Sequence, residues 1–465
     1  MTMSQPKKNS SSKIANPSRR DFVKTSSVIL AGGASLASSL NVARAAHAAG
    51  DDEIKIAVIG CGGRGTGAAT QALLTEGKVT LWAMADAFDA RIKSCLSQVE
   101  RVIEKGIADD NPNAKTAKID VSPERQFSGL DAYQKAIDSG VDMVILATPP
   151  GFRPLQFEAA VEANKHVFME KPVAVDAPGI RRVLAVGKKA QEKGLAVGVG
   201  LQRHHQAGYI ETIKRLQDGA IGDITLTRVY WNGGGVWTRT RADFEKMHGH
   251  KPTEMEYQVN NWYYFNWLCG DHICEQHIHN LDVSNWLKGS HPTEVHGMGG
   301  REVRDDNNHG QIFDHHFLEY TYADGTTMMS QCRHIKGCMN RVTEYATGTK
   351  GQAHIGKYTI EVPGWDKWKF KGKEKNPYQQ EHDDLFAAIR KGEPYSEAEY
   401  GAHSTMTSIM GRMASYSGKP VKWEDAINSQ IDLSPSTYDF SATPPVVPAE
   451  DGSYPVPVPG KSKVV

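Results

Sequence analysis

Apolar runs and amphipathic segments alternate along residues 54–201. Short apolar runs rich in β-branched residues predict buried strands, and longer amphipathic segments predict helices. The polar stretch 108–121 is expected to be a loop insertion. The expected strands are 54–59, 79–85, 141–147, 166–169 and 195–201, and the expected helices are 67–74, 90–105, 131–139, 154–164 and 175–193. Such repeats predict an α/β fold with a doubly wound parallel sheet, whose ligands bind at the carboxyl ends of the strands.

The first expected strand runs directly into a G-x-G-x-x-G turn, and Asp86 ends the second strand 21 residues after Gly65. In a dinucleotide-binding turn, Gly60 allows the tight bend, Gly62 lets the backbone approach the pyrophosphate, and Gly65 lets helix and strand pack closely. The helix N-terminus offers unpaired N–H groups to the phosphates. The alternative is a glycine-rich turn followed by a surface aspartate.

Asp86 at this position would accept hydrogen bonds from the ribose hydroxyls, so the expected cofactor is NAD, with NADP less favoured. Other cofactor contacts are expected at the strand ends, where polar residues and glycines gather. The expected cofactor-binding residues are Gly60, Gly62, Gly63, Arg64, Gly65, Asp86, Thr148, Pro149, Glu170, Lys171 and Gln202.

Composition and charge narrow the class of protein. Hydrophobic residues make up 39% and charged residues 23%, which excludes a collagen-like or wholly disordered chain. Lys+Arg and Asp+Glu both number 54, so no nucleic-acid partner is expected. No apolar stretch reaches the length of about 18 residues that a membrane span needs.

The balanced charge conceals a basic N-terminus, because residues 1–49 hold seven Lys or Arg against one Asp. Arg19 and Arg20 precede Phe22, an apolar run covers 28–40, and small-residue triplets follow. This order is typical of a twin-arginine secretory signal. The expectation is therefore export of the folded protein by the twin-arginine machinery to the periplasm or another extracytoplasmic compartment. The alternative is a basic tail with a chance arginine pair.

Several further motifs occur along the chain: Ala147-Thr148-Pro149-Pro150, Glu170-Lys171-Pro172, Gly222-Asp223-Ile224 and the run 415–421. Together with the glycine motif, they make residues 53–425 resemble the glucose-fructose oxidoreductase/inositol dehydrogenase/rhizopine-catabolism (Gfo/Idh/MocA) family. The resemblance implies a C-terminal α/β domain with a large, mostly antiparallel open sheet, whose outer face usually forms an oligomer interface, so a homo-oligomer is expected. The expected organisation is a signal peptide at 1–49, a Rossmann domain at 50–175, a substrate and oligomerisation domain at 176–430, and an extended Pro-rich tail at 431–465.

The resemblance also implies a catalytic lysine in the E-K-P triplet, here Lys171. It implies a carboxylate and a histidine four residues apart on a helix of the second domain. Aligning His279 to Asp282 with the family's H-x-x-D puts Glu275 at the carboxylate position, where classical members carry Asp. Spacing of i and i+4 would set Glu275 and His279 on one helical face, as a general base oriented by a carboxylate.

The stretch 260–268 is dense in aromatic and amide side chains, which suits either a carbohydrate pocket or simple packing of the domain or of an oligomer interface. No metal is expected, because the histidines of 272–279 lack the i, i+4 pair that helical metal motifs use. Cys269 with Cys274, or Cys332 with Cys338, are disulfide candidates in an oxidising compartment. The expected substrate-binding residues are Arg203, His204, Trp262 and Asp271.

These features predict an exported NAD-dependent oxidoreductase acting on a sugar or polyol hydroxyl. Because free NAD is scarce outside the cytoplasm, a tightly bound cofactor is expected. One alternative resembles the NAD-dependent α-N-acetylgalactosaminidases, which oxidise a sugar transiently and eliminate the aglycone, although their T-H-G-L-G-like segment is not found here. The other alternative is a non-catalytic carbohydrate- or cofactor-binding protein.

Overall fold

The computed structural model describes residues 53–465, so the predicted signal peptide lies outside the described residues. The first of its two sheets is parallel throughout and has seven strands. Its strands in spatial order are β3 (Lys118–Ile119), β2 (Val79–Asp86), β1 (Ile54–Ile59), β5 (Met143–Leu146), β6 (His166–Met169) and β7 (Val197–Val199), with β4 (Gln126–Ser128) beside β2. The chain order reverses between β1 and β5, which is where doubly wound sheets bind their ligands.

Helices cover both faces of this sheet because its strands are apolar on both sides. Ile56 and Val58 of β1 pack in the cluster that includes α3 and α4, whereas Ala57 and Ile59 pack in the cluster that includes α6, α7 and α8. The helices are α3 (Gly63–Leu73), α4 (Asp89–Ala108), α5 (Pro112–Thr116), α6 (Ala132–Ile137), α7 (Arg153–Glu162), α8 (Ala177–Glu192) and, from late in the chain, α15 (Pro377–Lys391).

Two expectations for this region differ from the structure. Helix α3 begins at Gly63, four residues before the expected start. The glycine turn ends at the N-cap residue Gly62, so Gly63 and Gly65 of the motif already lie within the helix. The stretch 108–121 is not a plain loop, since it contains α5 and β3, which pairs with β2. The sheet itself continues to Val199 in β7, beyond residue 175.

The second sheet has nine strands and is mostly antiparallel, as expected; β8 and β11 form a parallel pair within it. Alternate residues of β11 are buried, so one face of the sheet is covered. The spatial order is β15 (Trp368–Lys369), β14 (Thr359–Glu361), β13 (Gln352–His354), β12 (Arg341–Gly348), β8 (Ile224–Gly233), β11 (Thr327–His334), β10 (His315–Thr321), β9 (Glu294–Gly300) and β16 (Val421–Lys422).

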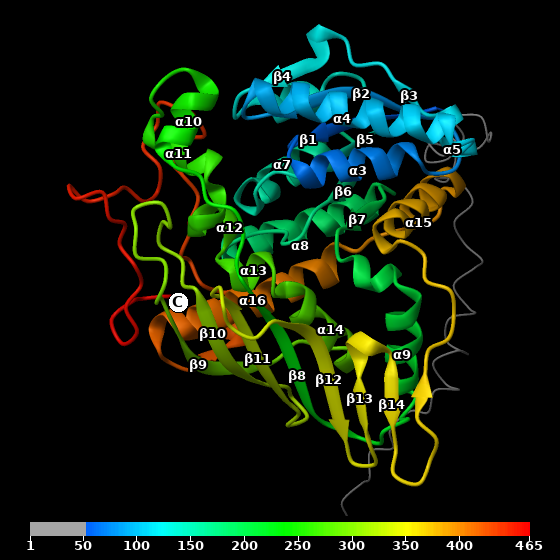
Figure 1. Cartoon of the computed structure of the whole chain (residues 1–465), viewed down its shortest axis with the longest axis vertical. Coiled ribbons are helices and arrows are strands. Elements are labelled where there is room, and N and C mark those ends of the chain that lie inside the picture. Colours follow the sequence, from blue (N-terminus) through cyan, green and yellow to red (C-terminus); the bar gives the residue numbers. More distant parts are fainter. Residues whose placement is uncertain (1–52) are drawn as a thin grey trace, which may run out of the picture. The chain divides into compact units, whose positions relative to one another are not determined.

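Helices pack on the buried face of the second sheet and connect it to the first. Figure 1 shows α16 between the two sheets, where it contacts both β9 and α8. These helices are α9 (Ala207–Gln217), α12 (Asn266–Cys269), α13 (His272–Glu275), α14 (Ile278–Lys288), α16 (Ala398–Ser417) and α17 (Trp423–Ile427). This packing brings α13 and α14 to the carboxyl end of β6.

Residues 434–465 form no helix or strand, and they pack on their own chain. Gln258 donates a hydrogen bond to the Val446 carbonyl (2.7 Å), and Phe440 stacks on Phe88 with ring centroids 5.5 Å apart. Gln258 lies on α11 (Glu254–Asn260), which follows α10 (Arg241–His248). The tail therefore joins α11 to the first sheet. Within residues 53–465, no helix combines the length and apolar character required to cross a bilayer.

Candidate functional site

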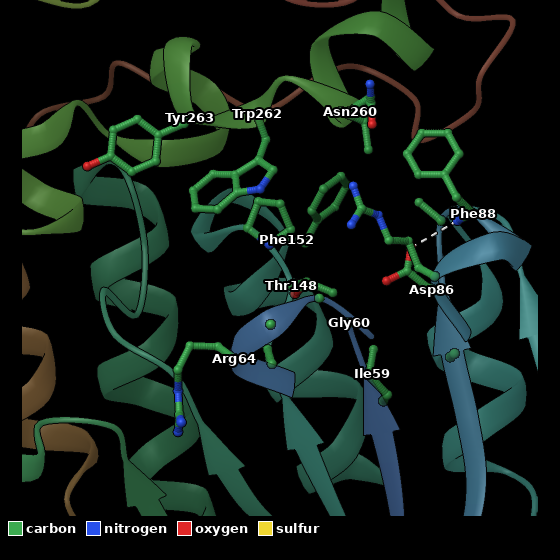
Figure 2. Close-up of a pocket in the computed structure, with 18 of the residues that line it drawn as sticks. Ile59, Gly60, Arg64, Asp86, Phe88, Thr148, Phe152, Asn260, Trp262 and Tyr263 are labelled. Atoms are coloured by element: carbon green, nitrogen blue, oxygen red, sulfur yellow. Dashed lines mark hydrogen bonds between the residues drawn. The ribbon is translucent and has the colours of Figure 1, made fainter. Parts of the chain in front are cut away.

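A cleft of about 340 Å³ opens at the carboxyl ends of β1, β2 and β5 (Figure 2). Its floor is the glycine turn. Gly60 has φ +98°, and a side chain there would lie 2.5 Å from the Ala147 carbonyl carbon. A side chain at Gly65 would lie 1.8 Å from the Gly60 oxygen. Both positions therefore need glycine for the turn itself.

Gly62 and Gly63 differ from these two, because a Cβ at either position would meet nothing within 4 Å. Both residues line the cleft. Gly62 is the N-cap of the 11-residue helix α3, and no side chain caps that helix end. Open space beside an uncapped helix N-terminus fits the pyrophosphate of a dinucleotide, since the free N–H groups point at the anion.

Asp86 lies in the wall of the cleft at the end of β2, as expected, but its carboxylate is already engaged. It accepts hydrogen bonds from the backbone N–H of Cys61 (2.7 Å) and of Phe88 (3.0 Å). Burial raises the pKa of the Asp86 carboxyl, while those two donors oppose the shift. Arg91 and Arg239 also line the cleft and place positive charge near this carboxylate.

Residues 236–263, which we call the roof, lie across the cleft from the glycine turn. Figure 2 shows Asn260 and Trp262 pointing from the roof toward Gly60 and Thr148. Arg239 fixes this segment by donating to the backbone oxygen (2.8 Å) and the side-chain oxygen (3.0 Å) of Asn260. Trp262, predicted to contact substrate, thus lines the cleft together with the predicted cofactor residues.

The Arg64 side chain leaves the cleft and turns toward the next strand end (Figure 2). Its Nε donates to the Glu170 carboxylate at 2.5 Å, and Glu381 lies 3.5 Å from the guanidinium. Burial lowers the pKa of Arg64, but the charges of Glu170 and Glu381 outweigh it and the net shift is upward. The ion pair between Arg64 and Glu170 therefore links the start of α3, just after the glycine turn, to the end of β6.

Lys171, the residue after Glu170, contacts Glu275. The Lys171 ammonium donates to the Glu275 backbone carbonyl (2.5 Å) and lies 3.2 Å from Glu275 Oε1. Burial raises the pKa of the Glu275 carboxyl, although the Lys171 charge acts in the opposite direction. The second carboxylate oxygen of Glu275 is buried and has no hydrogen-bond partner among the described residues. Glu275 also lines the cleft, so the pair stands at its edge.

Glu275 and His279 do not share a helix, and this expectation is wrong. Helix α13 ends at Glu275 and α14 begins at Ile278. His277 lies at the break between the two helices, where its Nε2 is hydrogen-bonded to the Ser330 hydroxyl of β11 (2.8 Å). This tertiary hydrogen bond is favoured over the backbone hydrogen bonds of a continuous helix. The Glu275 carboxylate binds Lys171, so it does not orient the His279 ring as expected.

His279 is 6% exposed, and its Nδ1 is buried with no hydrogen-bond partner among residues 53–465. Burial and then the positive charges of Lys171 and Arg203 lower the pKa of His279 well below its usual range. The imidazole is therefore neutral at physiological pH, and a neutral imidazole can accept a proton.

Three residues predicted to contact substrate bind other protein groups. Arg203 is paired with Glu344 and donates to the His279 carbonyl (2.8 Å), so it positions the start of α14. His204 bonds Asp282 at 2.9 Å and stacks between Trp286 and Tyr400.

Asp271, the third of these residues, is 0% exposed. It accepts hydrogen bonds from Tyr416 (2.5 Å) and from the Phe313 backbone (3.0 Å). Polar side chains near strand ends suggested ligand contacts, but these three are already satisfied inside the protein. None of them lines the cleft.

The remaining predicted cofactor residues divide into two groups. Thr148 and Pro149 line the cleft at the end of β5. Gln202 is outside the lining and donates to the Tyr378 hydroxyl (3.3 Å). The sequence reasoning missed Phe88 and Arg91, which follow Asp86 closely and therefore lie at the same strand end. All six cysteines are free thiols, so neither candidate disulfide is formed.

Residues 54–201 match the GFO_IDH_MocA family, described as an oxidoreductase family with an NAD-binding Rossmann fold. This stretch contains the whole parallel sheet, from β1 to β7. The chain is also similar to scyllo-inositol 2-dehydrogenase (NAD(+)) of Bacillus subtilis (strain 168), with 25% identity over 238 residues. That match covers 49% of this chain and 58% of the relative, so the chain spans about three fifths of the relative's length.

Solved Gfo/Idh/MocA-like structures share the fold of both sheets. An aldose-aldose oxidoreductase from Caulobacter crescentus, complexed with glycerol, matches with a TM-score of 0.61 and 19% identity, over 80% of this chain and 100% of that one. A scyllo-inositol dehydrogenase from Lactobacillus casei, with bound NAD(H) and scyllo-inositol, matches with a TM-score of 0.57 and 19% identity, again over 80% and 100%. At this identity the likeness establishes the fold.

Proposed function

We propose that the protein is an NAD-dependent oxidoreductase that oxidises a hydroxyl of a sugar or polyol. The observation that carries the proposal is the contact between Lys171 and Glu275 at the edge of a cleft built for a dinucleotide. A cation at this edge of the cleft could bind an alcohol oxygen beside the cofactor, which supports the proposal. The names of the similar proteins, which act on inositols and aldoses, support the substrate class.

In the proposed reaction, three side chains have different roles. Neutral His279 takes the proton of the substrate hydroxyl, and its lowered pKa keeps it neutral before the reaction. Lys171 donates a hydrogen bond to the same oxygen and stabilises its developing negative charge. Glu275 holds the Lys171 ammonium in place through its carbonyl and carboxylate oxygens. NAD, when bound, supplies the hydride-accepting nicotinamide.

NAD rather than NADP is the proposed cofactor, because Asp86 presents a carboxylate at the end of β2. Arg91 and Arg239 stand in the same cleft and would partly offset repulsion of a 2′-phosphate. We also propose that the cofactor stays bound through turnover. The roof over the glycine turn, fixed by Arg239 and by the C-terminal tail, supports slow release.

Export and assembly complete the proposal. The paired arginines and apolar run within residues 1–49 support export through the twin-arginine route to an extracytoplasmic compartment.

A homo-oligomer joined through the open sheet is proposed because Met298 and Phe317, on neighbouring strands β9 and β10, are 72% and 40% exposed. Light scattering of the purified protein, and of a variant with both residues changed to Lys, tests the interface.

The central experiment uses protein exported by a host with the twin-arginine system. Bound nucleotide is identified after denaturation, and the protein is then screened with sugars and polyols while the absorbance of reduced nicotinamide is followed. Cofactor reduction by a polyol or sugar is the expected result. Aglycone release from aryl glycosides without net reduction would replace the dehydrogenase with a redox glycosidase. Bound nucleotide that no substrate reduces would identify a binding protein instead.

A further inference from the structure

A second group of reactive side chains lies where α13 packs against β10 and β11, and none of its residues lines the cleft. His272 of α13, His316 of β10 and Cys332 of β11 each direct one potential ligand atom to a common point, and these three atoms all lie within 4.8 Å of one another. The residues are 0%, 2% and 1% exposed. His316 and Cys332 are directly paired across two antiparallel strands, so the sheet fixes two of the three positions.

The two histidines offer lone pairs at this point. His272 Nδ1 bonds the Asp271 carboxylate (2.8 Å), which requires the proton on Nδ1 and leaves Nε2 as an acceptor. His316 Nδ1 lies 2.8 Å from the Ser415 hydroxyl. That hydroxyl gives its proton to helix carbonyls, at 3.0 Å in the case of Arg412, so it accepts from His316 Nδ1 and leaves Nε2 as an acceptor too.

Both Nε2 atoms are buried, and neither has a hydrogen-bond partner among residues 53–465. A buried acceptor without a hydrogen-bond partner destabilises the folded protein, so two of them beside one thiol need an explanation.

We propose that His272, His316 and Cys332 bind a divalent d-block metal ion, with Zn²⁺ the best match. Imidazole nitrogen and thiolate sulfur are the ligands that zinc prefers, and a His₂Cys set leaves one position for a further ligand. The Asp271 carboxylate on His272 and the Ser415 hydroxyl on His316 are the outer-shell partners that orient metal-bound histidines. On binding, the S–H bond of Cys332 breaks, its proton is released to solvent water, and the metal–sulfur bond forms in its place.

The geometry needs a small adjustment. In a tetrahedral zinc site, two nitrogen ligands are about 3.3 Å apart and a nitrogen and a sulfur about 3.6 Å. The three ligand atoms, which lie within 4.8 Å of one another, must therefore approach by up to about 1.5 Å. An ion at this point would tie β10 and β11 to α13, whose last residue is Glu275. The histidine spacing within 272–279 gave no sign of it, because two ligands come from strands more than 40 residues later.

The competing arrangement is a charged His316 whose Nε2–H faces Asp271, since these atoms are 3.5 Å apart. Metal analysis of the folded, full-length protein from zinc-supplemented cells decides between the two. The expected content is about one zinc per chain, and Cys332→Ser lowers it by at least about tenfold, because even outer-shell changes weaken metal affinity 10–100-fold. Cys95→Ser, which removes a buried thiol from the first domain, is the matched control and keeps its zinc.

Folded wild-type protein without metal would overturn the site, and so would zinc retained in full by Cys332→Ser. If Cys332→Ser does not fold, the wild-type protein is reloaded with Co²⁺ after chelation. A thiolate-to-cobalt charge-transfer band with strong tetrahedral d–d absorption supports the site. A weak octahedral spectrum without that band contradicts it. Each readout is independent of the proposed oxidoreductase activity.

Discussion

The Lys171 ammonium donates hydrogen bonds to the backbone carbonyl and the carboxylate of Glu275, although the two residues lie 104 positions apart in the chain. One partner follows β6 of the parallel sheet, and the other ends α13, which packs on the second sheet. Neither sheet alone can form the contact, so the candidate catalytic group exists only where the two sheets meet.

Lys171→Met removes the cation and is expected to lower kcat by about 10²–10³-fold, because stabilisation of the developing oxyanion is lost. Cofactor affinity stays unchanged, since Lys171 does not line the dinucleotide cleft. Steady-state kinetics and NAD titration measure the two effects. Lys165→Met, which alters a lysine at the other end of β6, is the control and keeps full activity. Turnover by Lys171→Met within tenfold of wild type would remove Lys171 from the chemistry.

The pH profile of kcat/KM tests His279. Because burial and the Lys171 charge lower the pKa of His279, the free base persists as pH falls, and the acid limb lies below the ordinary histidine value of about 6.5. Removing the charge in Lys171→Met raises the His279 pKa, so the acid limb of the residual activity moves to higher pH. Profiles of both proteins over the acid range provide the measurement. An unmoved limb, or one that moves to lower pH, contradicts His279 as the base.

Two glycines of one motif are expected to respond in opposite ways to alanine. Gly62→Ala projects a methyl group into open space, so the thermal midpoint is retained while NAD affinity falls at least about tenfold, as the backbone can no longer approach the pyrophosphate. Gly65→Ala puts the methyl group 1.8 Å from the Gly60 oxygen and lowers the thermal midpoint. Calorimetry and NAD titration separate the two. Equal loss of stability in both variants would show that the cleft is not open at Gly62.

Glu344 supports His279 through Arg203. Glu344→Ala leaves the Arg203 guanidinium buried without its ion-pair partner, which is expected to lower the free energy of unfolding by about 3–5 kcal/mol. The comparison is Glu158→Ala, which breaks the half-exposed pair with Arg182 and costs less than about 1 kcal/mol. Urea unfolding of the two variants measures the difference. Similar losses in both would mean that the buried pair contributes no more than a surface pair.

Local patterns predicted the first sheet and the glycine turn, because their determinants are neighbours in sequence. The β-branched run 54–59, the turn at Gly60 and the acidic end of β2 lie within about 30 residues of one another, as such units require. The same reasoning located Asp86 and Thr148 at the strand ends that line the cleft. The large second sheet followed from the family resemblance and is observed.

The roles of the site residues that follow the parallel sheet were harder to predict, because their bonding partners are distant in sequence. Helical spacing placed Glu275 and His279 on one face, but His277 is held by Ser330, 53 positions later, and the helix breaks there. Arg203 was expected to face substrate, yet Glu344, 141 positions later, takes its charge. A sequence pattern shows which residues are polar, but it does not show which of them find a buried partner.

The stacking of Phe440 on Phe88 has a consequence for biosynthesis. Phe88 is made early, soon after the glycine turn, whereas Phe440 is made 352 residues later. The glycine turn and β2 can therefore fold on the ribosome well before Phe440 exists, but the wall beside Asp86 is completed only once residue 440 has been made and released. A chain that stops before residue 440 lacks that contact, so we expect it to bind the proposed nucleotide more weakly than a chain that includes it.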